Sequence, residues 1–269
     1  MPATPPRPVA LITGASSGIG ADIARELAAR GHDCVLTARR VNALEVLAAE
    51  LRGGAAGGGG GVEAHVIGAD LGDAAAPRAI CEELDRRSIH ISVLVNNAGF
   101  GLSAPFAAAD AARLMEMVQV NIGALTHLTR LLLPQMLARR SGRILNVAST
   151  AAFLPGPGMA VYYASKAYVE SLSVALSHET RGTGVTVTCL NPGPTSTEFS
   201  SVARPGRVKA IRHTRSMSSA QVAHRGVEAM FAGKPSVTPG CVNLAGVLAG
   251  RLAPRALLAR IAASLNRTV

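Results

Sequence analysis

The sequence predicts one α/β domain over residues 1–269, built as a doubly wound, mostly parallel sheet with helices on both faces. Short apolar runs alternate with longer helical patterns, and this alternation is typical of parallel sheets. A chain of 269 residues can bury a large core, and α/β chains of this length commonly form one domain. Hydrophobic residues make up 48% and charged residues 16%, which excludes a generally disordered chain.

Strand patterns recur at regular intervals along the chain. They are expected at 9–13, 33–37, 62–67, 91–95, 143–147 and 185–190, with a short strand around 236–238. Crossovers in such a sheet are right-handed, so helices cover both faces and ligands bind outside the carboxyl ends of the strands. We therefore expect the functional site among the residues that directly follow these runs.

The segments between the strands differ in character. One long helix is expected over 107–140, with a turn breaker at Pro134, and a later helix ends near Phe231. Composition assigns a flexible N-terminus at 1–8, a mobile glycine-rich surface loop at 53–61, a substrate loop at 194–219 and a variable basic C-terminal region at 220–269. That region ends in an amphipathic pattern, with Leu257, Ile261 and Leu265 at a spacing of four.

A glycine-rich motif directly follows the first expected strand and opens a helix. It reads Thr13-Gly14-Ala15-Ser16-Ser17-Gly18-Ile19-Gly20. Glycines let the backbone approach a pyrophosphate, and a helix N-terminus offers free N–H donors and a positive dipole. A plain strand-to-helix turn is the alternative, but the strand before and the helix after the motif favour dinucleotide binding.

Two arginines follow the second strand, where an acidic residue would bind the ribose 2′-hydroxyl of NAD. A planar guanidinium pairs bidentately with phosphate, so Arg39 and Arg40 predict NADP(H), which carries a 2′-phosphate. Asp33 begins the same strand and would lie at the wrong end of the sheet. The alternative is that both arginines are surface charges, although the helix dipole disfavours cations at a helix start.

Tyr162 and Lys166 are four residues apart, so on a helix they share one face. A positive charge beside a phenol favours the phenolate, which we expect to lower the pKa of Tyr162 toward working pH and make it a general acid/base. The chain has only three lysines and otherwise uses arginine, which indicates that the lysine at 166 is needed for its chemistry. The alternative is a packed tyrosine beside a solvated lysine.

Ser149 follows the expected strand 143–147 and should therefore lie at the carboxyl edge of the sheet. Its hydroxyl can donate to a substrate oxygen and stabilise developing alkoxide charge. Alternatively, Ser149 caps a turn before Pro155, a role for which Thr150 is also available.

These motifs, with several others in the same order, resemble the signature set of the short-chain dehydrogenase/reductase family. The match runs from Val9 to Phe199 and comprises Thr13 to Gly20, Asp70, Asn96-Asn97-Ala98-Gly99, Asn121, Ser149, Tyr162 with Lys166, and Pro192-Gly193. The resemblance implies a Rossmann fold with a seven-stranded sheet, and an oxidoreductase that interconverts a carbonyl compound and a secondary alcohol. With the apolar long helix, it also suggests a homodimer or homotetramer.

The resemblance implies further roles for individual residues. Asn121 would hold a water that links Lys166 to solvent, which completes a tetrad with Ser149 and Tyr162. The cofactor would be flanked by Asn96, Ala98 and Gly99, with Asp70 at the adenine, Pro192, Gly193, Thr195 and Thr197 at the nicotinamide, and Tyr162 and Lys166 at the reacting end. Asn97 is interpreted as structural.

The net charge of +10 is confined to the C-terminal part of the chain. Residues 1–199 hold 16 basic and 16 acidic residues, whereas residues 200–269 hold 11 basic residues and only Glu228 as an acid. Such asymmetry favours an anionic partner, although a solubility bias explains it equally well. We expect a hydrophobic carbonyl substrate that carries an anion, such as an acyl thioester, beside the basic residues Arg204, Arg207, Lys209, Arg212 and Arg215.

A cofactor-sensing protein that binds nucleic acid or membrane through the basic region is the rival hypothesis. A sensor needs no proton relay, and the region lacks aromatic residues after Phe231 for base stacking, so nucleic acid is disfavoured. Peripheral membrane contact through residues 253–266 is a third hypothesis, although core packing or a subunit contact explains the same apolar stripe.

Histidines and cysteines indicate neither a metal nor a disulfide framework. The four cysteines lie too far apart for a zinc spacing and are interpreted as reduced thiols, and His127 and His178 stand alone. No metal is therefore expected. No signal-like segment or long uncharged apolar run occurs, so a cytoplasmic location is expected.

Overall fold

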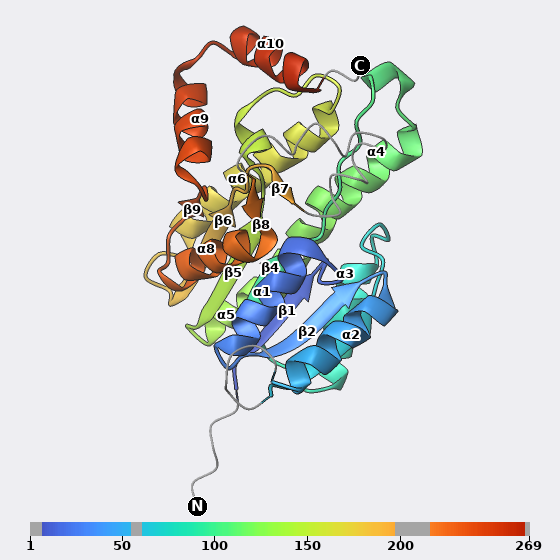
Figure 1. Ribbon diagram of the computed structural model, residues 1–269. Helices are drawn as coiled ribbons and strands as arrows, with labels where there is room; N and C mark the ends of the chain where they lie inside the picture. The colour runs from blue at the N-terminus through green and yellow to red at the C-terminus, as the bar shows by residue number, and fades with distance from the viewer. Residues whose placement is uncertain (1–6, 55–60, 197–215, 267–269) are drawn as a thin grey trace, which may run out of the picture.

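A computed structural model describes residues 7–54, 61–196 and 216–266 and contains the expected parallel sheet. Its seven strands lie in the order β3-β2-β1-β4-β5-β6-β9, and every neighbouring pair is parallel (Figure 1). The order reverses between β1 and β4, and in doubly wound sheets ligands bind at the carboxyl ends beside this point. The predicted fold class is confirmed.

The strands begin and end close to the predicted positions. They are β1 (Val9–Thr13), β2 (Asp33–Ala38), β3 (Ala64–Gly68), β4 (Ile91–Asn96), β5 (Gly142–Val147), β6 (Val185–Leu190) and β9 (Ser236–Val237). The third strand starts two residues later than expected. Val62 instead donates its N–H to the carbonyl oxygen of Leu51, at the end of the preceding helix.

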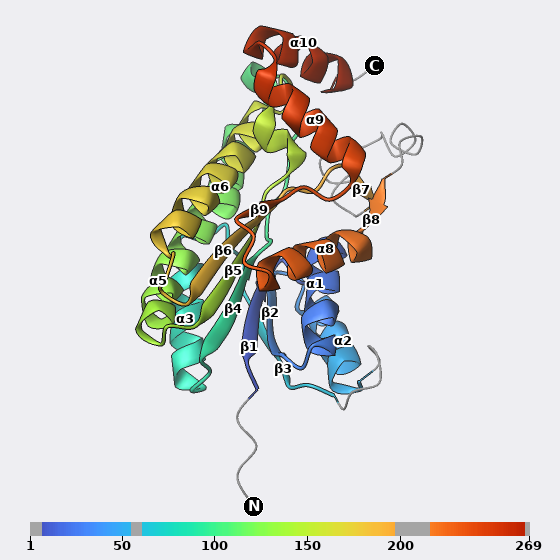
Figure 2. The same cartoon turned by 90° about the vertical axis from the view of Figure 1, so that its left-hand side faces the viewer.

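Helices cover both faces of the sheet (Figure 2). One face carries α1 (Gly18–Ala29), α2 (Val41–Arg52) and α8 (Ser219–Phe231), and the other carries α3 (Ala76–Arg86), α5 (Leu125–Ala138) and α6 (Ala160–Glu179). A separate apolar cluster lies under each layer. This packing leaves the carboxyl ends of the strands for the site.

The predicted helix 107–140 starts later than expected and is not regular. A 3-10 turn occupies Phe106–Ala108, and α4 begins at Ala111 because the Asp110 side chain accepts hydrogen bonds from the N–H groups of residues 112 and 113. A π-helical turn, η2 (Gln119–Ala124), separates α4 (Ala111–Val118) from α5. Pro134 lies inside α5 without ending it.

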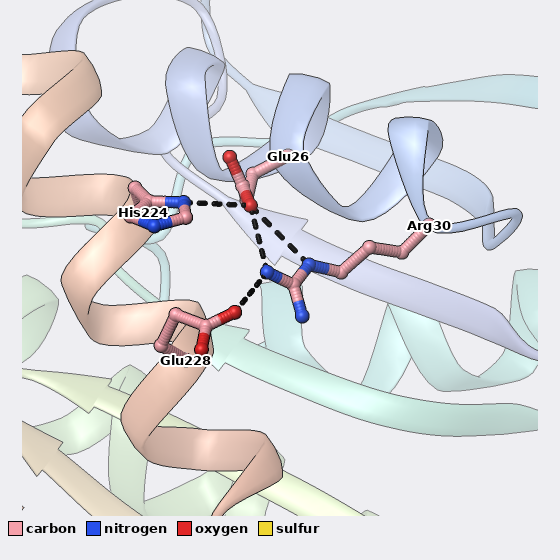
Figure 3. Close-up of polar contacts among 4 residues, drawn as sticks. All are labelled: Glu26, Arg30, His224 and Glu228. Atoms are coloured by element: carbon pink, nitrogen blue, oxygen red, sulfur yellow. Dashed lines mark hydrogen bonds and ion pairs between the residues drawn. The ribbon is translucent and has the colours of Figure 1, made fainter. Parts of the chain in front are cut away.

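A charged cluster joins α8 to α1 (Figure 3). Glu26 accepts from Arg30 at 2.9 Å and lies 3.1 Å from Nδ1 of His224, while Arg30 also pairs with Glu228. The Arg30 guanidinium lies 5.2 Å from the ring centroid of Phe231. These contacts fix α8, which follows the predicted substrate loop, on the helix that the glycine motif opens.

The C-terminal region contains two helices after α8, α9 (Cys241–Leu252) and α10 (Arg255–Asn266). Before it, a small parallel pair of β7 (Thr195–Ser196) with β8 (Met217–Ser218) lies at the two ends of the predicted substrate loop. The expected amphipathic end corresponds to α10, whereas α9 was not predicted. Among the residues described, no helix is both long and apolar enough to cross a bilayer.

Several predicted segments lie partly outside the described residues. These are residues 1–6 of the N-terminus, 55–60 of the glycine-rich loop and 197–215 of the substrate loop, which include Thr197 and the five basic residues of that loop.

Candidate active site

The glycine motif forms a tight backbone turn between β1 and α1. Gly14 and Gly18 have φ angles of +64° and +56°, a region that L side chains rarely adopt. A Cβ at Gly14 would lie 2.9 Å from Cα of Ala98. A Cβ at Gly20 would collide with the carbonyl oxygen of Gly14. Glycine is therefore required for the close packing of this turn, which leads directly into the N-terminus of α1, where free N–H groups can bind a phosphate.

Asn97 fastens the segment after β4 to the glycine motif. Its Nδ2 donates to the carbonyl oxygens of Thr13 (2.9 Å) and Gly14 (3.1 Å). The Thr13 hydroxyl accepts from the N–H groups of Asn97 and Ala98, at 2.9 and 3.0 Å. Asn97 is structural, as interpreted, and the Thr13 hydroxyl is a contributor that the sequence analysis missed.

The two arginines after β2 point to different neighbours. Arg40 donates from its guanidinium to the hydroxyls of Ser16 (3.2 Å) and Ser17 (2.8 Å), inside the glycine motif. Arg39 instead pairs with Glu116 of α4 at 3.3 Å and is 58% exposed. Arg40 therefore lies beside the motif, while the charge of Arg39 is partly balanced.

Two other residues predicted to bind the cofactor, Asn96 and Asp70, differ in burial. The Asn96 side chain is buried and donates to Thr129 (3.0 Å) and Asn146 (2.9 Å), so only its backbone can contact a cofactor. Asp70 is exposed after β3 and accepts from the N–H of Gly72 at 2.9 Å. Its carboxylate thus shapes the turn that follows β3.

The segment after β6 reaches the carboxyl end of β5. The carbonyl oxygen of Pro192 accepts from the N–H of Thr150 at 2.9 Å and from the Ser149 hydroxyl at 3.4 Å. Thr195 donates its hydroxyl to the carbonyl oxygen of Gly193 at 2.9 Å. These bonds hold residues 192–195 beside Ser149.

Ser149, Tyr162 and Lys166 come together at the carboxyl end of β5. The Ser149 hydroxyl is hydrogen-bonded to the Tyr162 phenol and also accepts from the N–H of Ala151 at 3.1 Å, so it caps a turn and faces the tyrosine at once. Lys166 donates to the carbonyl oxygen of Val147 at 2.9 Å, and its Nζ lies 5.8 Å from the Tyr162 ring centroid. Both side chains are buried.

Burial dominates the protonation of this pair. It raises the pKa of Tyr162 to about 12, and the hydrogen bond from Ser149 opposes that rise. Burial also lowers the pKa of Lys166 to about 8. The expected lowering of the Tyr162 pKa is therefore wrong for the protein alone, because burial disfavours the phenolate more than the hydrogen bond with Ser149 stabilises it. The phenol stays protonated at neutral pH and is ready to donate a proton.

Asn121 lies in the π-helical turn, and its side chain lies near Lys166. Its Oδ1 accepts from the N–H of Phe100 at 3.1 Å, and its Nδ2 donates to the hydroxyl of Ser165 at 3.0 Å. A Cβ at Gly99 would lie 3.0 Å from Oδ1 of Asn121 and 3.4 Å from Nζ of Lys166. The π turn thus turns Asn121 toward the backbone beside Lys166.

Glu170, a buried acid that the sequence analysis missed, connects the helix that carries Lys166 to neighbouring segments. Glu170 lies one helical turn beyond Lys166 and accepts from Nδ2 of Asn191 at 2.8 Å and from the Ser236 hydroxyl at 3.0 Å. These bonds tie α6 to the residue before Pro192 and to β9. The spacing of four from Lys166 was the available signal.

The residues present fit a dinucleotide. The glycine turn opens directly into a helix N-terminus, two hydroxyls and a guanidinium adjoin it, and the serine, tyrosine and lysine lie at the same sheet edge. Fold and site together define an oxidoreductase of the dinucleotide-binding α/β class.

Comparison with known proteins agrees with this class. Residues 8–207 match the family model described as short chain dehydrogenase. The chain is 37% identical over 200 residues to sulfoacetaldehyde reductase 2 of Chromohalobacter salexigens, and the alignment covers 74% of this chain and 77% of that protein. It is 35% identical to the NADP-dependent 3-hydroxy acid dehydrogenase YdfG of Escherichia coli (strain K12), with the same coverage. The chain belongs to the short-chain dehydrogenase family.

Solved structures agree. A short-chain dehydrogenase from Sphingobium yanoikuyae in complex with NADPH superposes with a TM-score of 0.79 at 32% identity, covering 91% of this chain and 93% of that one. The bulky-bulky ketone specific alcohol dehydrogenase from Comamonas testosteroni gives 0.75 at 30% identity, with 91% and 92% covered. The predicted family and enzyme class are confirmed.

We expect Lys166→Met to raise stability at neutral pH while it damages the site. Because burial lowers the Lys166 pKa from 10.5 to about 8, the folded state disfavours the ammonium by up to roughly 3 kcal/mol below pH 8. That cost fades as pH rises toward 10.5, where the unfolded lysine also loses its proton. Thermal unfolding at pH 7 should show a higher Tm for the variant, reduced by the lost bond to Val147, and a smaller gain at pH 10.

Lys234→Met is the matched control, since Lys234 is exposed. It should leave Tm almost unchanged at both pH values. A Lys166→Met protein that is less stable than wild type at pH 7 would contradict the burial argument.

Proposed function

We propose that the protein is an NADP(H)-dependent oxidoreductase that interconverts a carbonyl compound and a secondary alcohol. The observation that carries the proposal is the Ser149, Tyr162 and Lys166 group at the carboxyl end of β5, on the same sheet edge as a glycine turn that Arg40 adjoins. When bound, NADPH supplies the hydride in this family of reactions. The chain's own residues then orient the substrate and transfer the proton to or from its oxygen.

Each residue has a role that follows from its contacts. The Ser149 hydroxyl, which faces the Tyr162 phenol, orients the substrate oxygen and stabilises charge that develops on it. Tyr162 donates its proton to that oxygen in reduction and accepts one in alcohol oxidation. Lys166 is poised for exchange, since its pKa of about 8 allows both protonation states near neutral pH. For Asn121 we propose the role that the family resemblance implies, which is to hold a water that links Lys166 to solvent.

The surroundings of Tyr162 favour an apolar substrate. Met117, Ala151 and Met159 are buried against Tyr162, and partly buried apolar side chains pack around them: Phe100, Leu102, Leu114, Val161 and Tyr163. Relatives named for sulfoacetaldehyde, a 3-hydroxy acid and very-long-chain 3-oxoacyl-CoA all act on compounds with an anionic group. We therefore propose a hydrophobic or acyl-type carbonyl substrate that carries an anion.

The cofactor-sensing hypothesis gains no support from the relatives named above, each of which is an oxidoreductase. We propose a cytoplasmic location, which is supported by the absence of disulfides among the four free cysteines. We also propose a homodimer or homotetramer, as the family resemblance implies. Cell fractionation and light scattering on the purified protein test these two points.

The test of the function is the oxidation of NADPH and NADH, followed by absorbance with a panel of neutral and anionic ketones and acyl thioesters. We expect turnover with NADPH, and faster turnover with the anionic members. No oxidation of either nucleotide by any carbonyl compound would overturn the proposed reaction. Faster turnover of neutral ketones would overturn only the substrate class.

Arg40→Asp is expected to weaken NADPH binding about 10- to 100-fold and to leave NADH binding nearly unchanged, because one charge-assisted bond to the 2′-phosphate is lost. Arg39→Asp should have a smaller effect, since Glu116 already balances Arg39. Fluorescence titration with both nucleotides measures the ratio. The control is Arg78→Asp, an exposed arginine on α3. An unchanged NADPH preference in both Arg39 and Arg40 variants would show that the phosphate binds elsewhere.

A further inference from the structure

The two C-terminal helices carry large apolar side chains on their outer side. Leu244, Leu248 and Leu252 recur every four residues on α9, and Leu257 and Ile261 are four apart on α10. These five side chains, here called the apolar face, are between 45% and 91% exposed. Only Ala253 and Pro254 separate α9 from α10, so the two stripes meet at a corner where Leu252 is the most exposed.

Each helix also has a separate buried side that packs on the rest of the protein, so the apolar face is not a core surface turned outward. Val247 of α9 and Leu258 and Ala262 of α10 are buried. Asn266 at the end of α10 donates to the carbonyl oxygen of Pro157 at 3.1 Å, in the loop that precedes the catalytic helix. The orientation of the helices is thus fixed by contacts with the body of the protein.

The charges around the apolar face have one sign. Arg255 and Arg260 are exposed on α10, and the chain has no acidic residue after Glu228. Within the described residues, neither arginine makes an ion pair. An exposed apolar helix face bordered by arginines is the pattern of interfacial helices, in which apolar side chains enter the acyl region and cations contact anionic headgroups.

We propose that the apolar face of α9 and α10 docks peripherally on a lipid bilayer that contains anionic phospholipid. Both views place these helices at the end of the molecule beyond the carboxyl ends of the strands (Figures 1 and 2). Docking there turns the end of the protein that carries Tyr162 toward the membrane, the phase in which hydrophobic carbonyl compounds concentrate.

A second copy of the chain fits this face less well. A symmetric dimer brings the same patch of two subunits together, so Arg255 and Arg260 would meet the same arginines with no acidic residue from this region to balance them. An anionic bilayer supplies the opposite charge over its whole area. The charge pattern therefore selects the lipid surface.

Vesicle co-sedimentation of the full chain tests the proposal. Wild type is mixed with vesicles of phosphatidylcholine alone or of phosphatidylcholine and phosphatidylglycerol in equal parts, at low and high salt. We expect binding to the anionic vesicles that weakens with salt. Leu252→Asp with Leu257→Asp should reduce the partition constant at least about 10-fold, and Arg255→Gln with Arg260→Gln should reduce it about fivefold per arginine.

The matched control is Val46→Asp, because Val46 is an equally bare apolar residue, 72% exposed, on α2. It should bind vesicles like wild type. Every variant is also assayed for NADPH oxidation with a water-soluble carbonyl substrate. Retained activity with lost vesicle binding separates docking from the proposed reaction, and supports docking even if the substrate class proves different.

Absence of wild-type binding to either vesicle overturns the proposal, as does equal binding to neutral and anionic vesicles. A third outcome also overturns it: Leu252→Asp with Leu257→Asp converts an oligomer to monomers in light scattering while vesicle binding is unchanged, which assigns the face to a second copy.

Discussion

Tyr162→Phe is expected to lower kcat for carbonyl reduction by about 10²- to 10⁴-fold, the usual contribution of a positioned general acid. The substitution removes only the hydroxyl, and the ring keeps its packing against Met117, Ala151 and Met159. NADPH affinity should change little, since the nucleotide contacts predicted at the glycine turn are intact. Stopped-flow absorbance with saturating NADPH separates the chemical step from binding.

Tyr168→Phe is the control, because Tyr168 lies on the same helix but is exposed and bonds to the Thr126 hydroxyl at 3.0 Å. Its kcat should match that of wild type. Equal rates for Tyr162→Phe and wild type would disprove the assignment of the proton donor, whatever the effect on the Michaelis constant.

The strand order and both helical layers follow from features that are local in sequence. Apolar runs such as Val185–Leu190 are buried on both sides, so they read as strands without reference to the rest of the chain. Handedness of the crossovers then limits the topology. Helix α9 was missed although Leu244, Leu248 and Leu252 recur every four residues, because Gly246 and Gly250 inside it disfavour a helix.

Some features of the candidate site follow from local sequence patterns, and others depend on contacts between distant segments. Tyr162, Lys166 and Ser149 were predictable because chain spacing or a strand end places each of them. The Arg40 contacts with Ser16 and Ser17, and those of Glu170 with Asn191 and Ser236, join segments at least 21 residues apart, so no local pattern reports them. The sign of the Tyr162 pKa shift was also beyond reach, because burial depends on the whole fold.

Gly14→Ala is expected to lose both stability and nucleotide binding. The left-handed backbone at φ +64° costs an alanine about 1 kcal/mol, and the Cβ at 2.9 Å from Cα of Ala98 forces the turn to move, which costs roughly 1–3 kcal/mol more. Since Asn97 bonds to the carbonyl oxygen of Gly14, the displacement also shifts the segment after β4. Thermal unfolding with and without NADPH measures both effects.

Gly31→Ala separates backbone strain from the shape of the turn. Gly31 has φ +79°, but a Cβ there meets nothing within 4 Å. This variant should lose only about 1 kcal/mol and keep the full rise in Tm that saturating NADPH gives to wild type. Gly14→Ala should lose that rise, because the clash of its Cβ with Ala98 displaces the turn that a pyrophosphate approaches. If both variants keep the same NADPH-dependent rise, the phosphates do not bind at the turn after β1.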